Sequence, residues 1–289
     1  MRTTQTGGFP IGFRRGWTEW FADTEGMIAW AKSNDMGVID VGADLEACRA
    51  VANAGLRIGS ADLKAWSGIA TADAAKRRAF VEENDAYVAE AVKTGATNFF
   101  AVILPADPKL PRGENHGYAV QGLKALGPVL EKHGAKLVLE GWPGEGALAC
   151  TPETYRSLVK QAESPAIGIN YDPSHLIRMG IDPVRFLKEF GERVYHVHGK
   201  DTEYDREAVY EFGTEQNPAL GETHGFGSSF WRYTIPGHGE TPWTAVLGLL
   251  KGSDYRGAVC IELEDERFNG SEAGEKAGLL AGASFLQSV

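Results

Sequence analysis

Cysteine is scarce in this sequence, and its scarcity argues against a disulfide framework. Only three occur, Cys48, Cys150 and Cys260; they are far apart, odd in number and form no CxxC pair. We expect each to be a small buried hydrophobic residue in a reducing compartment. Long apolar runs are missing too: no stretch reaches the ~18 residues of a membrane span, and the N-terminus MRTTQTGGFPIGFRRG lacks the apolar centre of a signal peptide. These absences predict a soluble cytoplasmic protein without a membrane partner.

Basic clusters and nucleotide-binding loops are also absent. Lysine and arginine are dispersed and the net charge is −10, which disfavours nucleic acid as a partner because an acidic surface repels phosphate backbones. No GxGxxG follows a strand-like segment and no GxxxxGK[ST] occurs, so dinucleotide and P-loop proteins lack their main support. No glycine-rich helix start follows the last two strand-like segments, which favours an unphosphorylated small-molecule substrate.

What the sequence does contain is a regular alternation of short apolar segments and longer amphipathic ones. Short, mostly apolar segments are typical of strands buried on both faces. Eight are predicted to be strands: 10–14, 37–42, 56–61, 98–104, 136–142, 167–172, 194–199 and 258–264. Helical patterns lie between them, the clearest at 72–95, 116–134, 152–163 and 271–287. Eight βα units in sequence predict an α/β protein, a (β/α)8 TIM barrel forming a single domain over residues 1–289.

One region interrupts the alternation. Residues 201–242 are rich in Gly, Thr, Glu and aromatic residues, and they are too long for an ordinary βα loop. Loops of this length are usually lids or binding loops. We therefore expect an irregular loop insertion on the catalytic face of the barrel, after the seventh strand.

Four consecutive strands end in side chains that can bind a metal. In a (β/α)8 barrel the chemistry lies at the carboxyl ends of the strands. The fifth to eighth strands bring there, in order, Glu140, Asp172, His198 and Glu262. Carboxylates with one imidazole suit a single divalent ion, Mn²⁺ first and Mg²⁺ or Co²⁺ as alternatives. Each residue alone could be a helix cap or a salt-bridge partner, but the coincidence on four neighbouring strands favours a metal site.

A second histidine stands two residues before the first, in VYHVHG. Side chains two apart on a strand point the same way, so His196 shares a face with His198. We expect His198 to be the ligand because it lies nearer the end of the strand. His196 is then a supporting group behind it, or a core histidine with satisfied hydrogen bonds.

Five segments carry a resemblance to a known family: VLEGW, NYDPSHL, YHVHGKD, GHGETPW and YRGAVCIELED. Over nearly its whole length the chain resembles the xylose isomerase-like TIM barrels known as sugar phosphate isomerases/epimerases, which include ketose 3-epimerases, hydroxypyruvate isomerases and inosose dehydratases. The resemblance implies that the four strand-end residues bind the metal, and that Glu140 and Glu262 also act as an acid/base pair on opposite faces of the substrate. It further implies that His175, in DPSH, lies beside the substrate and the metal and takes part in catalysis.

The implied reaction begins with removal of a proton from the carbon next to a carbonyl. A divalent ion on the carbonyl oxygen stabilises the enediolate that forms, and a group of matched pKa returns the proton. We therefore expect a metal-dependent isomerase or epimerase of a sugar or keto-sugar. The alternative is a lyase or dehydratase that acts by β-elimination on an inosose or a 3-keto-glycoside, C-glycoside deglycosidation included. For such a substrate the 201–242 insertion would supply an added wall.

Other residues are candidates for substrate binding. Lys200 could hold a substrate oxygen or form a salt bridge where a loop begins. Trp17 and Trp142 lie at or just past strand ends, where an indole could stack on a sugar or simply fill the core. Arg232 and His238, in the long insertion, could contact the substrate or stabilise the loop.

Two further classes of function fit less well. A related-fold endonuclease acting on abasic DNA needs a trinuclear metal cluster, whose additional histidines LRIGSADL and FFAVILPADP do not supply. A non-catalytic carbohydrate-binding or subunit role is the other, since fold does not imply function, but a complete ligand set disfavours it. The sequence leaves open a homo-oligomer and the need for a second, different subunit.

Overall fold

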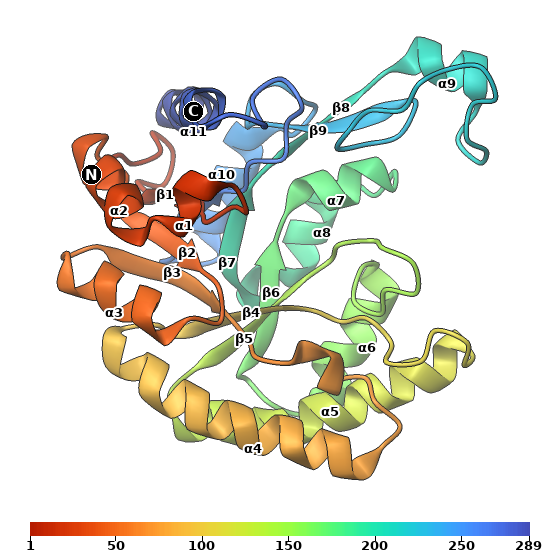
Figure 1. The fold of residues 1–289 in the computed structure, drawn as a ribbon. Coiled ribbons are helices and arrows are strands. Elements are labelled where there is room, and N and C mark those ends of the chain that lie inside the picture. Colours follow the sequence, from red (N-terminus) through yellow and green to blue (C-terminus); the bar gives the residue numbers. More distant parts are fainter. The chain divides into compact units, whose positions relative to one another are not determined.

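The computed structural model describes residues 1–289, and all eight predicted strands are present in it (Figure 1). They are β1 (Ile11–Arg14), β2 (Val38–Val41), β3 (Arg57–Asp62), β4 (Asn98–Val102), β5 (Lys136–Glu140), β6 (Ile167–Tyr171), β7 (Val194–Gly199) and β10 (Val259–Ile261). They form a closed barrel in the order β1-β10-β7-β6-β5-β4-β3-β2. The predicted (β/α)8 TIM barrel is therefore confirmed.

Helices alternate with the strands. They are α1 (Glu19–Ala22), α2 (Thr24–Ser33), α3 (Leu45–Asn53), α4 (Ala74–Ala91), α5 (Arg112–Lys132), α6 (Pro152–Ala162), α7 (Pro173–Arg178), α8 (Pro183–Phe190), α10 (Trp243–Gly252) and α11 (Glu272–Gln287), with 3-10 turns at Trp66–Gly68, Val92–Thr94 and Gly191–Arg193. Thr151 caps α6 and Pro152 opens it, as its start signals predict. Helix α5 begins at Arg112 rather than at 116, because Gly113 and Gly117 weaken the helical pattern there.

The chain forms two compact units, which are described separately. The first unit comprises Met1–Val38, Asp172–Glu189 and His198–Val289, and the second comprises Ile39–Tyr171 and Phe190–Val197. The expectation of a single domain stays a prediction.

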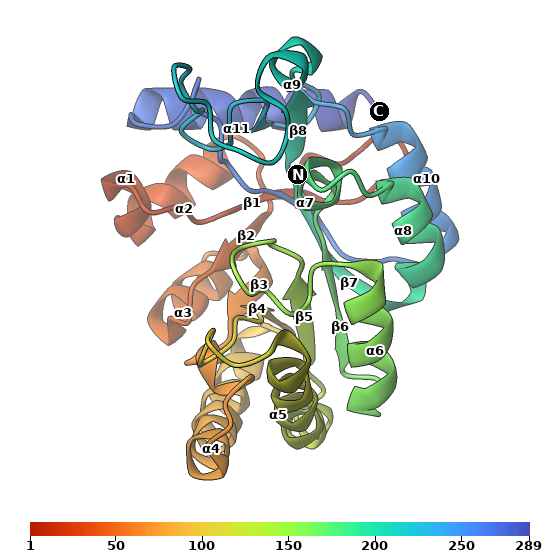
Figure 2. The same ribbon diagram turned by 90° about the vertical axis from the view of Figure 1, so that its right-hand side faces the viewer.

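In the second unit, β3 to β6 pair in parallel, and Glu140 at the end of β5 lies opposite Asn170 of β6. Every residue of β6 is buried, as a strand covered on both faces requires. Outside the strands, α5 packs beside α4 and α6 (Figure 2).

In the first unit, β1 pairs with β10 so that Phe13 lies opposite Ile261. The expectation that 201–242 is irregular holds only in part, because two strands and a helix lie within it. Strand β8 (Asp201–Tyr204) pairs antiparallel with β9 (Trp231–Thr234), and α9 (Arg206–Phe212) lies at their far end (Figure 1). We call residues 201–234 the arm. The two strands of the arm are short and half polar, so the sequence pattern does not indicate them. Their pairing with each other stabilises them.

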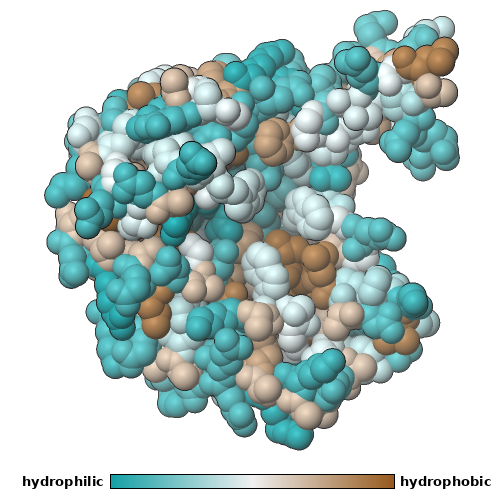
Figure 3. All heavy atoms as spheres, in the orientation of Figure 1, coloured by the Kyte–Doolittle hydropathy of each residue, from teal (hydrophilic) through white to brown (hydrophobic).

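The arm has its own apolar core, formed by Phe230, Trp231 and Tyr233 against Tyr204 and Val209. On the face shown in Figure 3 the arm is mostly hydrophilic, with a small hydrophobic patch at its tip. Elsewhere, all three cysteines are free and buried, as expected. No helix is both long enough and apolar enough to cross a membrane.

Candidate metal and active site

A buried lysine lies at the centre of the candidate site in the first unit. Lys200, just after β7, is only 1% exposed. Its Nζ donates to Glu262 Oε2 at 2.5 Å and to Glu264 Oε2 at 2.9 Å. The same Nζ lies 3.3 Å from Asp172 Oδ2 and 4.6 Å from the centre of the Tyr233 ring. Three carboxylates and an aromatic face thus surround one ammonium, and each of them favours positive charge at that point. We call Lys200 and the three carboxylates the lysine cluster.

Asp172 reaches this cluster from the turn between β6 and α7. Its Oδ1 accepts hydrogen bonds from the backbone N–H of Ser174 at 2.9 Å and from the Ser174 hydroxyl at 2.6 Å. This is the cap that a short polar residue before Pro173 is expected to form. The other oxygen, Oδ2, lies near Lys200 and is 3.5 Å from Nε2 of His175. One carboxylate therefore both fixes the start of the helix and contributes to the cluster.

Tyr233 of the arm orients His175. The Tyr233 hydroxyl lies 2.6 Å from His175 Nδ1 and accepts a hydrogen bond from Arg178 Nη1 at 2.7 Å. Burial raises the pKa of Tyr233, so the hydroxyl stays neutral. When His175 Nδ1–H donates to Tyr233, the Nε2 lone pair is directed at the cluster, 3.4 Å from Lys200 Nζ.

Glu262 is held between two cations. Strands β1 and β10 are in register at Phe13 and Ile261, so the residues that follow, Arg14 and Glu262, come level with each other. Arg14 Nε lies 3.3 Å from Glu262 Oε1, while Lys200 contacts Oε2. His198 is fully buried, and its Nδ1 lies 3.5 Å from the same Oε2. Glu262 is therefore fixed at both oxygens.

The donor groups of this unit fit a divalent ion. Ligand atoms of Asp172, His175 and Glu262 lie within 4.8 Å of one another, and all three residues are buried. Carboxylate oxygens and a neutral imidazole are donors that Mn²⁺ and similar ions accept. The predicted ligands Asp172, Glu262 and His198 are thus neighbours, and His175 joins them more closely than the sequence suggested.

The remaining predicted ligand, Glu140, belongs to the second unit. Asn170 Nδ2 donates to Glu140 Oε2 at 2.6 Å, and both side chains are buried. The β5–β6 register sets these two residues opposite each other. The Asn170 amide thus orients the Glu140 carboxylate.

His196, also in the second unit, has a carboxylate partner. Its Nε2 lies 2.8 Å from Asp40 Oδ2, and both residues are completely buried. This pair fits the expectation of a core histidine at Nε2, the ring nitrogen that faces Asp40.

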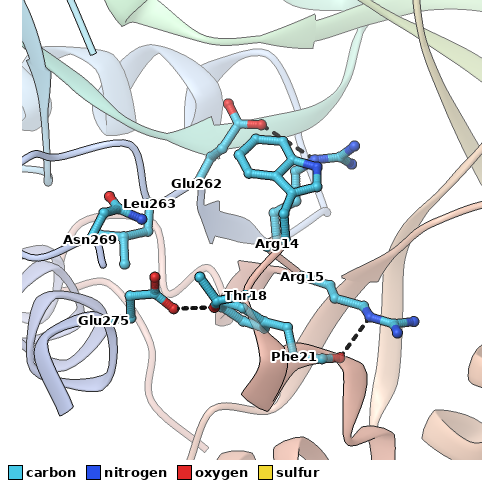
Figure 4. A pocket seen from close by; sticks show the side chains of 10 residues that line it. Arg14, Arg15, Thr18, Phe21, Glu262, Leu263, Asn269 and Glu275 are labelled. Carbon is cyan, nitrogen blue, oxygen red and sulfur yellow. Dashed lines mark hydrogen bonds and ion pairs between the residues drawn. The ribbon is translucent and has the colours of Figure 1, made fainter. Parts of the chain in front are cut away.

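A small cavity adjoins Glu262 on the side of Arg14 (Figure 4). Trp17 lines it and is 76% exposed. Glu275 of α11 is fully buried and accepts hydrogen bonds from Thr18 Oγ1 at 2.5 Å and Trp20 Nε1 at 2.7 Å. These bonds fix the segment after β1, so Trp17 stands on an anchored loop.

Other residues expected to bind substrate have different surroundings. Arg232 is buried, and it donates from Nη1 to Asp265 at 2.9 Å and from Nε to Glu203 at 2.7 Å. It therefore ties β9 to the segment that follows β10. His238 is on an exposed turn after β9, and Trp142 is partly exposed after β5.

Asp201 organises the GHGETPW loop. Its carboxylate accepts hydrogen bonds from Gly237 N, Thr241 N, Thr241 Oγ1 and Trp243 Nε1 at 2.7–3.1 Å. Burial raises the pKa of Asp201, while these hydrogen bonds oppose the rise. A Cβ at Gly239 would lie 2.4 Å from Asp201 Oδ1, so the loop can close over the carboxylate only with glycine there.

Glu264 and Tyr233 are not among the residues predicted from the sequence. Glu264 follows Glu262 by two positions, and Tyr233 follows Trp231 by two. Alternation of this kind is the signal that could have found them. The sequence pattern does not indicate β9, so it gives no reason to single out Tyr233.

Comparison with known proteins identifies the family of this chain. The family model of the xylose isomerase-like TIM barrel matches residues 29–289, and the chain therefore belongs to this family. It is 33% identical over 132 residues to the uncharacterized protein YfiH of Bacillus subtilis (strain 168). This aligned segment covers 45% of this chain and 40% of that protein. It is 28% identical over 146 residues to the inosose dehydratase of Clostridium tetani (strain Massachusetts / E88), covering 50% of this chain and 46% of that protein. The matched segments thus span less than half the length of these relatives.

Among solved structures, D-psicose 3-epimerase from Clostridium cellulolyticum H10, described with D-tagatose, superposes with a TM-score of 0.72. The match covers 97% of this chain and 99% of that one at 14% identity. At this identity the likeness shows the fold alone.

Proposed function

We propose that the protein is a divalent-metal-dependent isomerase or epimerase that acts on a sugar or keto-sugar. The observation that carries this proposal is the convergence of Asp172, His175 and Glu262, whose ligand atoms lie within 4.8 Å of one another in a buried site. Membership of the xylose isomerase-like family supports it, and so does the fold shared with a ketose epimerase.

Glu140 and His198 complete the proposed ligand set. Glu140 ends β5 opposite Asn170, and Asp172 follows Asn170 by two residues along the chain. His198 already contacts Glu262. A divalent ion held there, Mn²⁺ being our first choice, would supply a Lewis acid that polarises the substrate carbonyl.

Glu262 is the proposed base that takes the proton from the carbon next to the carbonyl. Arg14 at Oε1 holds this buried carboxylate in place. Glu140 is the proposed partner that returns a proton from the other face. Lys200 would donate a hydrogen bond to a substrate oxygen, while His175, with Nε2 on the ion, would lie beside the substrate.

Trp17 and Trp142 are proposed to border the sugar, because an indole face packs well on the C–H face of a sugar ring. For Arg232 we propose an indirect role, since its guanidinium is engaged in holding the arm. His238 would contribute through the same loop. The three free buried cysteines support a reducing, cytoplasmic setting.

A lyase is the second candidate, favoured by the likeness to an inosose dehydratase and by the long arm. It would use the same proton abstraction at Glu262. The Lys200 ammonium would then protonate the leaving group instead of donating a hydrogen bond to a substrate oxygen.

NMR in D₂O separates the two candidates. The Mn²⁺-loaded protein would be incubated with a panel of free ketoses, inososes and 3-keto-glycosides, with EDTA-treated protein as the matched control. We expect deuterium at the carbon next to the carbonyl together with a new epimer or aldose. An enone or a released aglycone would replace the first reading by the lyase. No metal-dependent exchange with any substrate in the panel would contradict both.

A further inference from the structure

The position among the candidate metal ligands is already filled by a cation of the chain itself. Lys200 Nζ contacts Glu262 Oε2 at 2.5 Å and lies 3.3 Å from Asp172 Oδ2 and 3.4 Å from His175 Nε2. These are the three residues whose ligand atoms converge within 4.8 Å. A divalent ion bound by them would therefore meet an ammonium at close range, and two cations so close repel each other strongly in a buried site.

We propose that Lys200 is an exchangeable internal cation. In the metal-free protein it neutralises the ligand carboxylates, and metal binding displaces it onto Glu264. The inference rests on the proposed metal site and assigns to Lys200 and Glu264 a role that the proposed function does not require.

Glu264 is suited to receive the displaced ammonium. Its Oε2 is already 2.9 Å from Lys200 Nζ, and its side chain is 19% exposed, against 1% for Lys200 and Asp172. Glu264 is thus the most solvent-exposed residue of the lysine cluster. A rotation of the end of the lysine side chain would be enough to trade the Asp172 and Glu262 contacts for Glu264.

The Tyr233 ring would limit how far the ammonium moves. Its centre is 4.6 Å from Nζ, within the range of a cation–π contact. Lys200 held between Tyr233 and Glu264 would stay close enough to donate a hydrogen bond to a substrate. Metal loading would therefore convert it from a counter-ion of the ligands into a substrate-binding group.

This arrangement predicts a penalty on metal binding. A ligand that binds only one of two states has its apparent affinity reduced by the fraction of protein in that state. Removing the ammonium removes the competing state. Lys200→Met should therefore bind Mn²⁺ about tenfold more tightly or better than the unaltered protein.

The decisive measurement is a double-mutant cycle on Mn²⁺ affinity, by isothermal titration calorimetry on the full-length, EDTA-treated protein without substrate. Glu264→Gln should weaken Mn²⁺ binding several-fold, because the displaced ammonium loses its acceptor. In the Lys200→Met background, Glu264→Gln should have no effect on the affinity. A contribution of Glu264 through simple charge would instead weaken binding by the same factor in both backgrounds, and that result would overturn the proposal.

Thermal melting in EDTA gives a second readout. Lys200→Met should lower the melting temperature of the metal-free protein, because the carboxylates lose their counter-ion, and Mn²⁺ should restore it. Lys200→Gln, which keeps a hydrogen-bond donor without the charge, serves if the methionine variant does not fold without metal. Lys276→Met is the matched control: this lysine of α11 pairs with Glu272, and its loss should leave Mn²⁺ affinity unchanged.

The outcomes separate this inference from the proposed function. If the unaltered protein binds Mn²⁺ and Lys200→Met binds it equally or less tightly, the inference fails and the metal site stands. If no variant binds Mn²⁺, both fail. Binding by Lys200→Met alone would be the strongest support, because the internal cation would then exclude the metal almost completely.

Discussion

Two buried sets of charged residues differ in how their charges are balanced. In the second unit, Asp40 and His196 form a pair at 2.8 Å, one acid with one base. In the first unit, Asp172, Glu262 and Glu264 face Lys200, and Arg14 adds a second cation at Glu262, so three acids meet two cations. Burial alone therefore does not mark a functional site. An excess of one charge does, because a substrate, a proton or a metal ion can relieve it.

The largest expected effect is on turnover, at the carboxylate held between two cations. Glu262→Gln keeps the shape of the side chain but cannot accept the proton, so turnover should fall by about 10²–10⁴-fold. The rate of deuterium exchange into the substrate measures it, and circular dichroism checks the fold. Glu240→Gln, an exposed glutamate of the same unit, is the control. Full metal content and unchanged turnover in Glu262→Gln would show that the site is misassigned.

The two histidines of VYHVHG test the comparison directly. His196→Ala would leave Asp40 as a buried carboxylate without its partner, and stability should fall by about 3–5 kcal/mol. His198→Ala should lose metal affinity and activity while the fold survives. Thermal melting and metal content measured on both variants decide the matter. If His196→Ala proves to be the variant that loses metal, the roles of the two residues are exchanged.

The barrel was predictable because its signals are local. Each strand has a short apolar segment of its own, and α6 carries both a cap and a proline in its first turn. The arm was not predictable from such signals. Its polar strands are stabilised by pairing across about thirty residues of intervening chain, from Asp201 opposite Thr234 to Tyr204 opposite Trp231.

The candidate site was partly predictable for the same reason. Asp172 and Glu262 immediately follow strands, and a TIM barrel gathers such residues at one end. Lys200 was recognised as a candidate, but its central position depends on partners from three separate segments. Tyr233 lies on a strand whose existence the pattern does not reveal. Contacts between distant segments are a property of the folded chain rather than of any single motif.

The smallest expected effect concerns a buried group with no charge to balance. Burial raises the pKa of the Cys48 thiol to about 11, so at neutral pH almost none of it is the reactive thiolate. A disulfide reagent such as DTNB should leave the native protein unmodified for hours and titrate three thiols after denaturation. Fast labelling of Cys48 in the native state would mean that its surroundings open readily. Slow labelling would sharpen the comparison, because Cys48 would then be a buried group that is inert, in contrast to the role proposed for the lysine cluster.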